Sequence, residues 1–215
     1  MDKKNFKQKN EGNTKAPNSK GNEVQNAVIL YFHDLAYLLV GILLVLLLVF
    51  RVVVVSGPSM NQTLVDGDYL LLLSNVFYGT PKQGDIIVAS KGNFKNGEPI
   101  IKRVIATEGQ WVDIDFNAGI VYVSDDPLQL RDHPLDEPYT NTPTNLDERV
   151  QFPLQVEEGC LFVMGDNRNS SKDSRSPDIG LIDCREILGK AIFLAFPGNS
   201  AGSIVRDYKR IGVVS

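Results

Sequence analysis

A serine and a lysine are the residues of this chain whose types and settings could carry out chemistry together. Ser59 lies in "SGPSMNQTL" (56–64), directly after a long apolar run. A serine hydroxyl becomes a good nucleophile only when a base takes its proton, and the usual base is histidine. Outside the apolar run the chain has only His133, which lies in the turn-rich stretch "LRDHPLDEP" and is expected at the surface. The other known partner of a catalytic serine is a lysine.

Lys102 is the lysine whose surroundings best suit that task. A lysine accepts a proton only when neutral, so its pKa must fall several units below about 10.4, which burial among apolar groups can achieve. Lys102 lies within the apolar run "PIIKRVIAT", whereas most other lysines lie in the N-terminal tail or in polar loops. Lys190 in "GKAIF" is the main rival. Because a strand lysine commonly points to solvent, the pattern alone leaves the Ser59–Lys102 pair a hypothesis.

A third stretch, "GDNRNSSKDSR" (165–175), is dense in polar residues and follows the apolar run "CLFVM". Its eleven residues include two Asp, two Asn, two Arg and three Ser. Such a stretch could be a solvated turn. It could also be a buried network in which acids and arginines satisfy one another beside a site, and its density exceeds what a turn needs.

The apolar segment before Ser59 is long enough to span a membrane. No charged residue occurs from Leu35 to Phe50, and an apolar stretch of about 22 residues crosses about 30 Å of hydrocarbon. Its length argues against a buried core helix, and the absence of an Ala-x-Ala site argues against a cleaved signal. We therefore expect an uncleaved signal-anchor at 28–50.

The charges around this segment predict its orientation. Residues 1–27 hold six lysines against three acids and are too polar to bury a core, so we expect a disordered cytoplasmic tail. The part after Arg51 is then extracytoplasmic, on the outer side of the plasma membrane.

Beyond the anchor, short β-branched runs predict a mostly β domain over 51–215. Each run is bounded by Gly, Pro, Asp or Asn, and no convincing amphipathic helix is present. The runs are "RVVVV", "DYLLLLS", "GDIIVAS", "PIIKRVIAT", "QWVDID", "GIVYVS", "CLFVMGD" and "GKAIFLAF". The polar, proline-rich stretch between Ser124 and Pro153 is expected to be a long loop or a small cap, more mobile than the core. The net charge of 52–215 is −7, which argues against nucleic-acid binding.

Taken in order, four motifs behind an N-terminal anchor resemble the bacterial type I signal peptidases, membrane-anchored serine proteases that remove signal peptides from exported preproteins. "SGPSMNQTL" resembles the box that carries the nucleophile, "GDIIV" the short middle box, "KRVIATEGQ" the box with the lysine base, and "GDNRNSSKDSR" the last box. The resemblance covers about residues 28–198.

The resemblance implies a fold and a mechanism. The fold is an antiparallel β catalytic core with a smaller, variable β insertion, here about 107–157, preceded by one transmembrane helix. In the mechanism Ser59 attacks the scissile carbonyl, Lys102 takes its proton and passes it to the leaving amine, and a water completes deacylation. The implied partners are preprotein signal peptides, the lipid bilayer and the protein-export machinery. No cofactor is implied, and no Cys/His spacing supports a metal site.

The resemblance also implies roles for further residues. Ser171 falls where a hydroxyl holds the lysine in place, and the backbone N–H of Ser59 is expected to form half of the oxyanion hole. The supporting ionic network is expected to comprise Asp166, Arg168, Asp173, Arg175 and Arg103. Shallow pockets for small substrate residues at positions −3 and −1 are expected around Val55, Met60, Leu64 and Ile101, with the substrate extended along 99–101.

Three positions set this chain apart within the resemblance. Gly57 lies where some relatives add a serine hydroxyl to the oxyanion hole, so the chain resembles the glycine-bearing, Gram-positive-like branch. Gln62 replaces the usual proline, which alters the rigidity of the turn, and Gln110 replaces the usual aspartate, which removes a charge.

Cys160 and Cys184 flank the last box, and the sequence leaves open whether they form a disulfide or remain free thiols.

Two other functions compete with signal peptide cleavage. A Ser-Lys protease that cleaves itself, as in LexA-like repressors, does not fit the anchor or the absence of a DNA-binding segment. A non-catalytic accessory protein of surface or pilus assembly would typically lack the serine or the lysine, and this chain has both.

Overall fold

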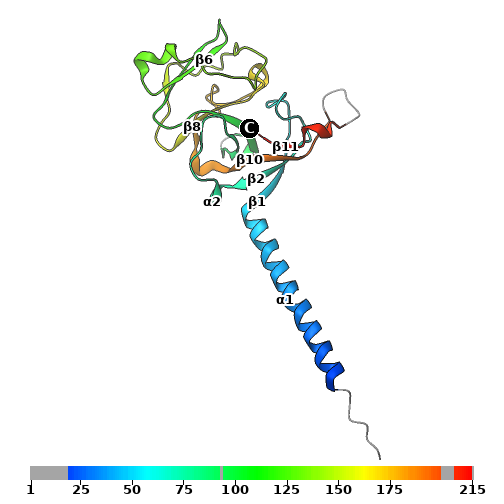
Figure 1. The fold of residues 1–215 in the computed structure, drawn as a ribbon. Coiled ribbons are helices and arrows are strands. Elements are labelled where there is room, and N and C mark those ends of the chain that lie inside the picture. Colours follow the sequence, from blue (N-terminus) through cyan, green and yellow to red (C-terminus); the bar gives the residue numbers. More distant parts are fainter. Residues whose placement is uncertain (1–18, 93, 200–205, 215) are drawn as a thin grey trace, which may run out of the picture. The chain divides into compact units, whose positions relative to one another are not determined.

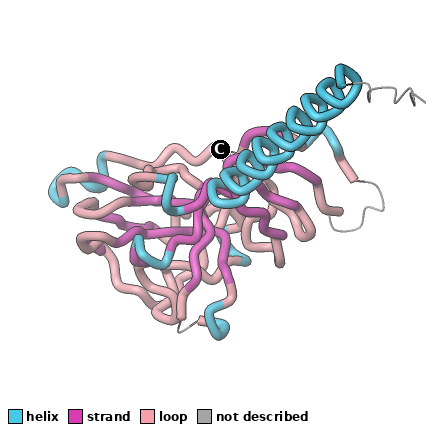
Figure 2. Tube along the Cα trace, turned by 90° about the horizontal axis from the view of Figure 1, so that it is seen from below, coloured by secondary structure: helices cyan, strands magenta, loops and turns pink. Residues whose placement is uncertain are grey.

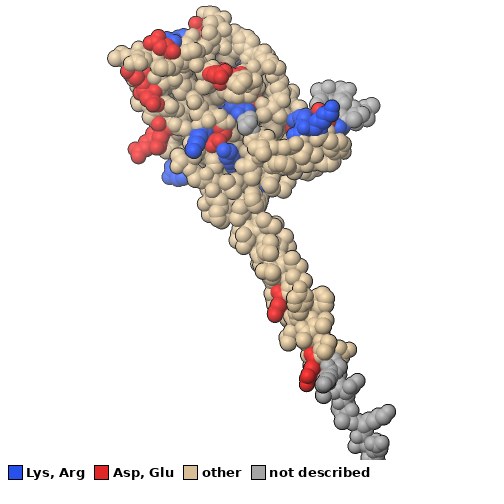
Figure 3. All heavy atoms as spheres, in the orientation of Figure 1, with Lys and Arg blue, Asp and Glu red and all other residues tan. Residues whose placement is uncertain are grey.

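The computed structural model describes residues 19–92, 94–199 and 206–214, and these fall into two compact units, one ending at Val45 and one beginning at Leu46. The described part of the first unit belongs to helix α1 (Ser19–Val49), whose last residues count with the second unit and which is drawn in blue to cyan in Figure 1. Its part Glu23–Val49 is apolar and long enough, at 27 residues, to cross a membrane, and none of its apolar window is buried within the protein. At about 1.5 Å per residue this part is about 40 Å long. No charged residue occurs in the helix from Leu35 to Val49, and this part is drawn in tan in the space-filling view (Figure 3).

The helix begins earlier than the sequence predicted. Residues 19–27, expected to belong to a disordered tail, form its first turns, while residues 1–18 of that tail lie outside the described part. Once an apolar helix is nucleated, each added residue contributes one hydrogen bond, so the helix extends into the polar flank. It ends at Val49, where the β-branched run Val52–Val55 favours a strand.

The second unit is built on antiparallel β-sheets, as Figure 2 shows in magenta. The larger sheet has the strand order β1-β2-β10-β3-β4-β8-β9, with β11 paired to β10. Its strands are β1 (Phe50–Val54), β2 (Tyr69–Ser74), β3 (Ile86–Ser90), β4 (Pro99–Ala106), β8 (Cys160–Met164), β9 (Ile182–Asp183), β10 (Ile187–Phe196) and β11 (Gly212–Val213). A smaller sheet has the order β6-β5-β7, with β5 (Trp111–Asp115), β6 (Ile120–Ser124) and β7 (Leu154–Gln155).

The helical pieces of this unit are short. They are α2 (Asn75–Tyr78) and the 3₁₀ turns η1 (Lys95–Gly97), η2 (Pro127–Asp132), η3 (Arg168–Ser170), η4 (Cys184–Glu186) and η5 (Tyr208–Arg210). The prediction of a mostly antiparallel β fold is therefore confirmed, and each of the eight apolar runs contains a strand. Strands β7, β9 and β11 have two residues each and are too short to give a periodic pattern.

The central strands β3 and β4 of the larger sheet are buried on both faces, which explains their unbroken apolar runs. In β3, Ile86 and Val88 join one core cluster, whereas Ile87 and Ala89 join a second cluster. Successive side chains of a strand point to opposite faces, so a strand covered on both sides needs apolar residues throughout. The third cluster joins the smaller sheet to β8 and includes Val112, Val121 and Phe162.

Strand β4 changes partners along its length, and this opens a cleft. Residues 99–103 pair with β3, while pairing with β8 begins only at Arg103. Among the described residues the first half of β4 is therefore paired on one side only. Strand β1 likewise pairs only with β2. Two free strand edges thus flank the loop that follows β1.

Candidate active site

A tight loop presents Ser59 directly after β1. The loop is closed at its base by backbone hydrogen bonds from Val55 N to Asp68 O (2.8 Å) and from Gly67 N to Val55 O (2.9 Å). Gly57 has a φ of +89°, which glycine adopts without strain, and its N–H donates to a carboxylate oxygen of Asp66 at 2.8 Å. The side chain of Ser59 is left partly exposed.

Lys102 meets this serine from the half of β4 that precedes its pairing with β8. Its Nζ donates to Oγ of Ser59 at 2.7 Å, although 43 residues separate the two in the chain. The lysine is only 5% exposed and its neighbours Ile100 and Ile101 are buried as well. The structure thus brings together the two residues that the sequence paired as nucleophile and base.

The last box holds the nucleophile loop from the other side. Asn167 donates through its backbone N–H to the carbonyl of Ser59 and through Nδ2 to the carbonyl of Pro58, each at 3.0 Å. The hydroxyl of Thr63 donates to Oδ2 of Asp166 at 2.5 Å. These contacts were not predicted, because an Asn or Thr in a polar loop carries no signal of its partner. They fix the backbone of Ser59 relative to the box.

Gly165 allows the close approach of these two loops. A Cβ added to this glycine would lie 2.4 Å from the carbonyl oxygen of Ser59 and 2.2 Å from Oγ of Ser171. No side chain fits there, so glycine is required for packing and not for its backbone freedom. The sequence analysis did not single out this residue, although its place at the end of an apolar strand is a recognisable signal.

The predicted ionic network is present and buried. Arg103 binds both carboxylate oxygens of Asp166 through Nε (2.9 Å) and NH2 (2.8 Å), and its NH1 donates to the carbonyl of Gly84 at 2.8 Å. Arg175 binds Asp173 through Nε and NH2, both at 2.8 Å. All four of these ion-paired side chains are at most 2% exposed. Each is a two-pronged arginine–carboxylate pair, the geometry that gives such pairs their directional specificity.

Arg168 departs from the expected pattern. Its guanidinium is fully buried, and its carboxylate partner is Glu137, which lies in the segment between β6 and β7 and not in the last box. The sequence analysis missed Glu137, because the polar segment around it was expected to be a mobile loop.

Ser171 is buried, at 3% exposure, but its hydroxyl does not hold the lysine in this structure. Its Oγ makes no hydrogen bond among the described residues and faces Gly165. The predicted contact with Lys102 is therefore not formed here, and the role of this hydroxyl stays a prediction. Forming the contact needs a turn of the side chain to another rotamer.

The two rival bases are engaged elsewhere or exposed. Lys190 pairs with Asp85 at 2.5 Å, and the hydroxyl of Tyr78 donates to the same carboxylate at 2.6 Å. Burial alone would raise the pKa of Asp85, but the hydrogen bonds from Lys190 and Tyr78 outweigh it and lower the pKa. Lys190 is therefore held in an ion pair with Asp85 and makes no contact with Ser59 among the interactions of the described residues. His133 is exposed, as predicted.

A cleft of about 550 Å³ opens over the dyad. Of the predicted substrate-binding residues, Val55, Met60 and Ile101 line it, whereas Leu64 lies outside its lining and packs in the first core cluster. The wall also includes Phe94, Glu98, Ser170 and Lys172, which the sequence analysis did not predict. Phe94 and Glu98 come from the polar loop before β4, where the pattern gave no sign that the loop folds back over the strand edge.

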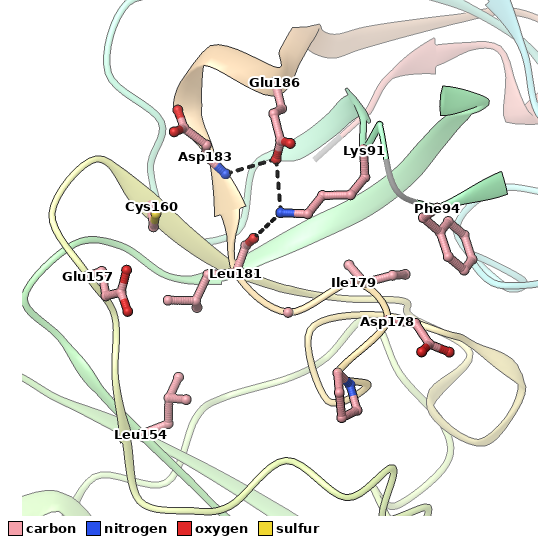
Figure 4. A pocket seen from close by; sticks show the side chains of 12 residues that line it. Lys91, Phe94, Leu154, Glu157, Cys160, Asp178, Ile179, Leu181, Asp183 and Glu186 are labelled. Carbon is pink, nitrogen blue, oxygen red and sulfur yellow. Dashed lines mark hydrogen bonds and ion pairs between the residues drawn. The ribbon is translucent and has the colours of Figure 1, made fainter. Parts of the chain in front are cut away.

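A larger hollow of about 950 Å³ contains neither Ser59 nor Lys102 (Figure 4). Of its charged side chains, Lys91 and Glu186 pair with each other, whereas Asp178 and Asp183 pair with Lys172 and Arg185, which do not line the hollow. Nζ of Lys91 donates to the carbonyl of Leu181 at 2.8 Å and pairs with Glu186 at 3.2 Å, and Glu186 also accepts from the N–H of Asp183. These bonds connect the end of β3 to η4, so the residues that they join have a structural role at the border of the hollow.

The two departures from the family pattern take specific conformations. Gln62 is exposed and has a φ of +90°, which a proline ring cannot adopt. Gln110 accepts from the N–H of Thr107 and donates to Asp125, both at 3.0 Å, and so closes the turn before β5.

Both cysteines are free thiols. Cys160 packs against the third core cluster and Cys184 against the second. No group of three His, Cys, Asp or Glu side chains suited to a metal occurs in the described part of the chain.

The family model and the curated relatives that match this chain point to one family. Residues 28–196 match the model of "Signal peptidase, peptidase S26". The chain is 36% identical to a probable signal peptidase I-1 of Synechocystis sp., over 80% of this chain and 85% of the relative. It is 35% identical to the signal peptidase I of Bacillus licheniformis, over 75% and 87%. A solved structure, a signal peptidase I of Enterococcus faecalis, is 26% identical with a TM-score of 0.41, over 53% of this chain and 97% of that chain.

Proposed function

This chain belongs to the signal peptidase family, peptidase S26, and from that membership we propose how its residues cleave signal peptides. It is a membrane-anchored serine endopeptidase that removes signal peptides from exported preproteins. The observation that carries the residue assignment is the 2.7 Å contact between Nζ of Lys102 and Oγ of Ser59 at a buried site. A non-catalytic accessory role is not favoured, because both members of the dyad are present and in contact.

Ser59 is the nucleophile and Lys102 its general base. With the lysine neutral and the proton on the hydroxyl, the same contact lets Nζ accept the proton as Oγ attacks the scissile carbonyl. The protonated Lys102 then gives this proton to the departing amine, which leaves an acyl-enzyme on Ser59. A water, deprotonated by the same lysine, hydrolyses that ester and frees the signal peptide.

The oxyanion is held by backbone groups. We assign the N–H of Ser59 to this role, because the bonds from Asn167 to the carbonyls of Ser59 and Pro58 hold that peptide in place. Gly57 offers no side-chain hydroxyl, and its φ of +89° would strain a serine at that position. On this basis we assign the chain to the branch that relies on backbone donors.

The substrate binds as an extended strand between the free edges of β1 and β4. An added strand can hydrogen-bond with the unpaired backbone of residues 99–101, while alternate side chains enter the cleft. Val55, Met60 and Ile101 wall shallow apolar pockets that admit small residues at positions −3 and −1. Leu64 supports these walls from the core beneath.

The orientation in the membrane follows the charge bias. The lysine-rich N-terminal flank remains in the cytoplasm, and the part from Arg51 onward works outside the plasma membrane, where preproteins emerge from the export machinery.

The test is cleavage of a preprotein in detergent by the native chain, Ser59→Ala and Lys102→Ala. Both variants should lose turnover while remaining folded, because nucleophile and base act as a unit. His133→Ala should cleave at the native rate, since that side chain is exposed in a loop. Near-native turnover by either dyad variant would overturn the assignment.

A further inference from the structure

The segment 137–150, between β6 and β7, contacts all three buried arginines around the dyad. The carboxylate of Glu137 accepts hydrogen bonds from NH1 (2.8 Å) and NH2 of Arg168. The ring of Tyr139 lies under the guanidinium of Arg103, with 3.9 Å between the guanidinium carbon and the ring centroid. The carbonyl of Leu146 accepts from NH1 of Arg175 at 3.2 Å. We propose that Glu137 and Tyr139 are positioning residues for the catalytic dyad, an inference that rests on the assignment of Ser59 and Lys102 above.

Glu137 acts through Arg168. A fully buried guanidinium needs a charged partner, because an unpaired charge loses its hydration without compensation. Within the described residues, Glu137 is the carboxylate that pairs with it, since both oxygens of nearby Asp166 are bound by Arg103. Held in this way, Arg168 donates through Nε to the carbonyl of Gly165 at 3.1 Å. Gly165 is the residue against which the backbone of Ser59 is packed.

Tyr139 acts through Arg103, the neighbour of Lys102 in β4. The guanidinium of Arg103 donates to Asp166 and to the carbonyl of Gly84, and the ring of Tyr139 covers one face of the guanidinium plane. A ring in this place attracts the cation and excludes water from the ion pair. The hydroxyl of Tyr139 donates to Glu137 at 3.2 Å, so the two positioning residues support one another. Burial, and then the neighbouring carboxylate of Glu137, raise the pKa of Tyr139 and keep this hydroxyl protonated.

Through these contacts the segment positions the catalytic residues, a role distinct from stabilising the fold. Through Arg168 it reaches the backbone on which Ser59 is packed, and through Arg103 and Asp166 it reaches Thr63 in the nucleophile loop. A misplacement of reacting groups by about 1 Å can cost about a hundredfold in rate. Loss of either positioning residue is therefore expected to lower kcat, while the cleft that binds the substrate is unchanged.

Two matched pairs of variants test the proposal on a signal-peptide substrate, well below the lowest thermal midpoint of the set. Glu137→Gln removes the charge and keeps the shape, and Asp136→Asn makes the same change on the exposed neighbouring carboxylate. Tyr139→Leu removes the ring, and Tyr139→Phe keeps it. We expect Glu137→Gln and Tyr139→Leu to lower kcat by about tenfold to a hundredfold with little change in KM. Asp136→Asn should stay close to native, and Tyr139→Phe, which loses only the hydroxyl bond to Glu137, should keep a kcat well above that of Tyr139→Leu.

Lys102→Ala, assayed in parallel, distinguishes failure of the positioning role from failure of the Ser59–Lys102 dyad. If Glu137→Gln and Tyr139→Leu keep the native kcat, and only their thermal midpoints fall, the segment has a structural role and the positioning proposal is wrong. That result together with an inactive Lys102→Ala would leave the dyad intact. Turnover by Lys102→Ala would instead remove the proposed dyad, and this inference with it.

Discussion

The carbonyl oxygen of Ser59 and the α-carbon of Gly165 are packed so closely that a methyl group on the glycine would lie 2.4 Å from that oxygen. Non-bonded carbon and oxygen atoms do not approach so near, so residue 165 has to be glycine while Ser59 keeps its place. The contact joins the nucleophile loop to the box that also supplies Asp166 and Asn167. The nucleophile is therefore positioned by packing between two loops as well as by its bond to Lys102.

Gly165→Ala should lower kcat by at least about a hundredfold, because the added methyl group displaces the backbone of Ser59 by a sizeable fraction of an ångström. Overpacking of this kind also lowers the free energy of unfolding by about 1–3 kcal/mol. Steady-state kinetics and thermal unfolding should be measured on the same preparation. Gly92→Ala, at a glycine with open space around its Cα, is the matched control and should be silent in both measurements. A Gly165→Ala variant with native kcat would show that the loop can move without loss of geometry.

Activity should rise with pH in the neutral to alkaline range. Lys102 works as a base only in its neutral form, and burial favours that form, so kcat/KM should increase as pH passes through a lysine pKa below the usual value of about 10.4. The measurement is a pH profile of kcat/KM on a peptide substrate, with thermal stability checked at each pH. A profile that rises near pH 4 would match a carboxylate, and one that rises near about pH 6.5 would match a histidine. Either profile, if flat at higher pH, would exclude Lys102 as the titrating base.

Lys102→Met should be inactive but at least as stable as the native protein near neutral pH. A lysine whose folded pKa lies below its unfolded pKa must lose a proton on folding, so it costs stability wherever the unfolded side chain is protonated. The cost is full below the folded pKa and disappears as pH rises to the unfolded pKa of about 10.4. The difference in thermal midpoint between the variant and the native chain should therefore shrink from pH 7 to pH 10. A methionine variant that is less stable than native at pH 7 would mean that Lys102 is a paired, charged residue.

Substrate side chains should be limited by size at the residue before the cut. The cleft walls formed by Val55, Met60 and Ile101 are almost fully buried and cannot retreat without loss of core packing. Replacing an alanine at position −1 of a preprotein by phenylalanine should block cleavage, as seen by gel mobility. Equal processing of both preproteins would rule out these residues as the pocket.

Gln62→Gly should leave the fold unchanged or stabilise it by up to about 1 kcal/mol, because a non-glycine residue at a φ of +90° pays a steric cost that glycine avoids. Gln62→Pro should destabilise the protein by several kcal/mol, on the order of 3, since the ring holds φ near −65°. The side chain of Gln62 is exposed, so neither change leaves a cavity. Thermal melts of the three forms check this, and a proline variant with a native midpoint would contradict the conformation of this turn.

The order of the anchor, the strands and the motifs could be predicted from the sequence, because each is recognisable in a short stretch of residues. An uncharged run long enough for a membrane, short β-branched runs between turn residues, and a lysine inside one of those runs are each visible in a few consecutive residues. Ser59, Lys102 and the acids and arginines of the last box were found in this way, with help from a family resemblance. The start of α1 at Ser19 was missed, because the polar residues at 19–27 carry no helical pattern of their own.

What the sequence by itself determined is therefore the identity of the reacting groups and the strands that carry them, since both depend on residue type and short-range pattern. Only the tertiary structure decided which groups meet. Among the described residues, β4 pairs with β8 only from Arg103 onward, so residues 99–101 pair with β3 alone. The close packing at Gly165 and the contacts of Glu137 and Tyr139 with buried arginines come from segments far apart in the chain. Such contacts have no local signature. They form because a buried charge is stable only beside a partner of opposite charge, and because atoms of closely packed loops cannot overlap. Which residues satisfy these two conditions depends on the segments that the fold brings together.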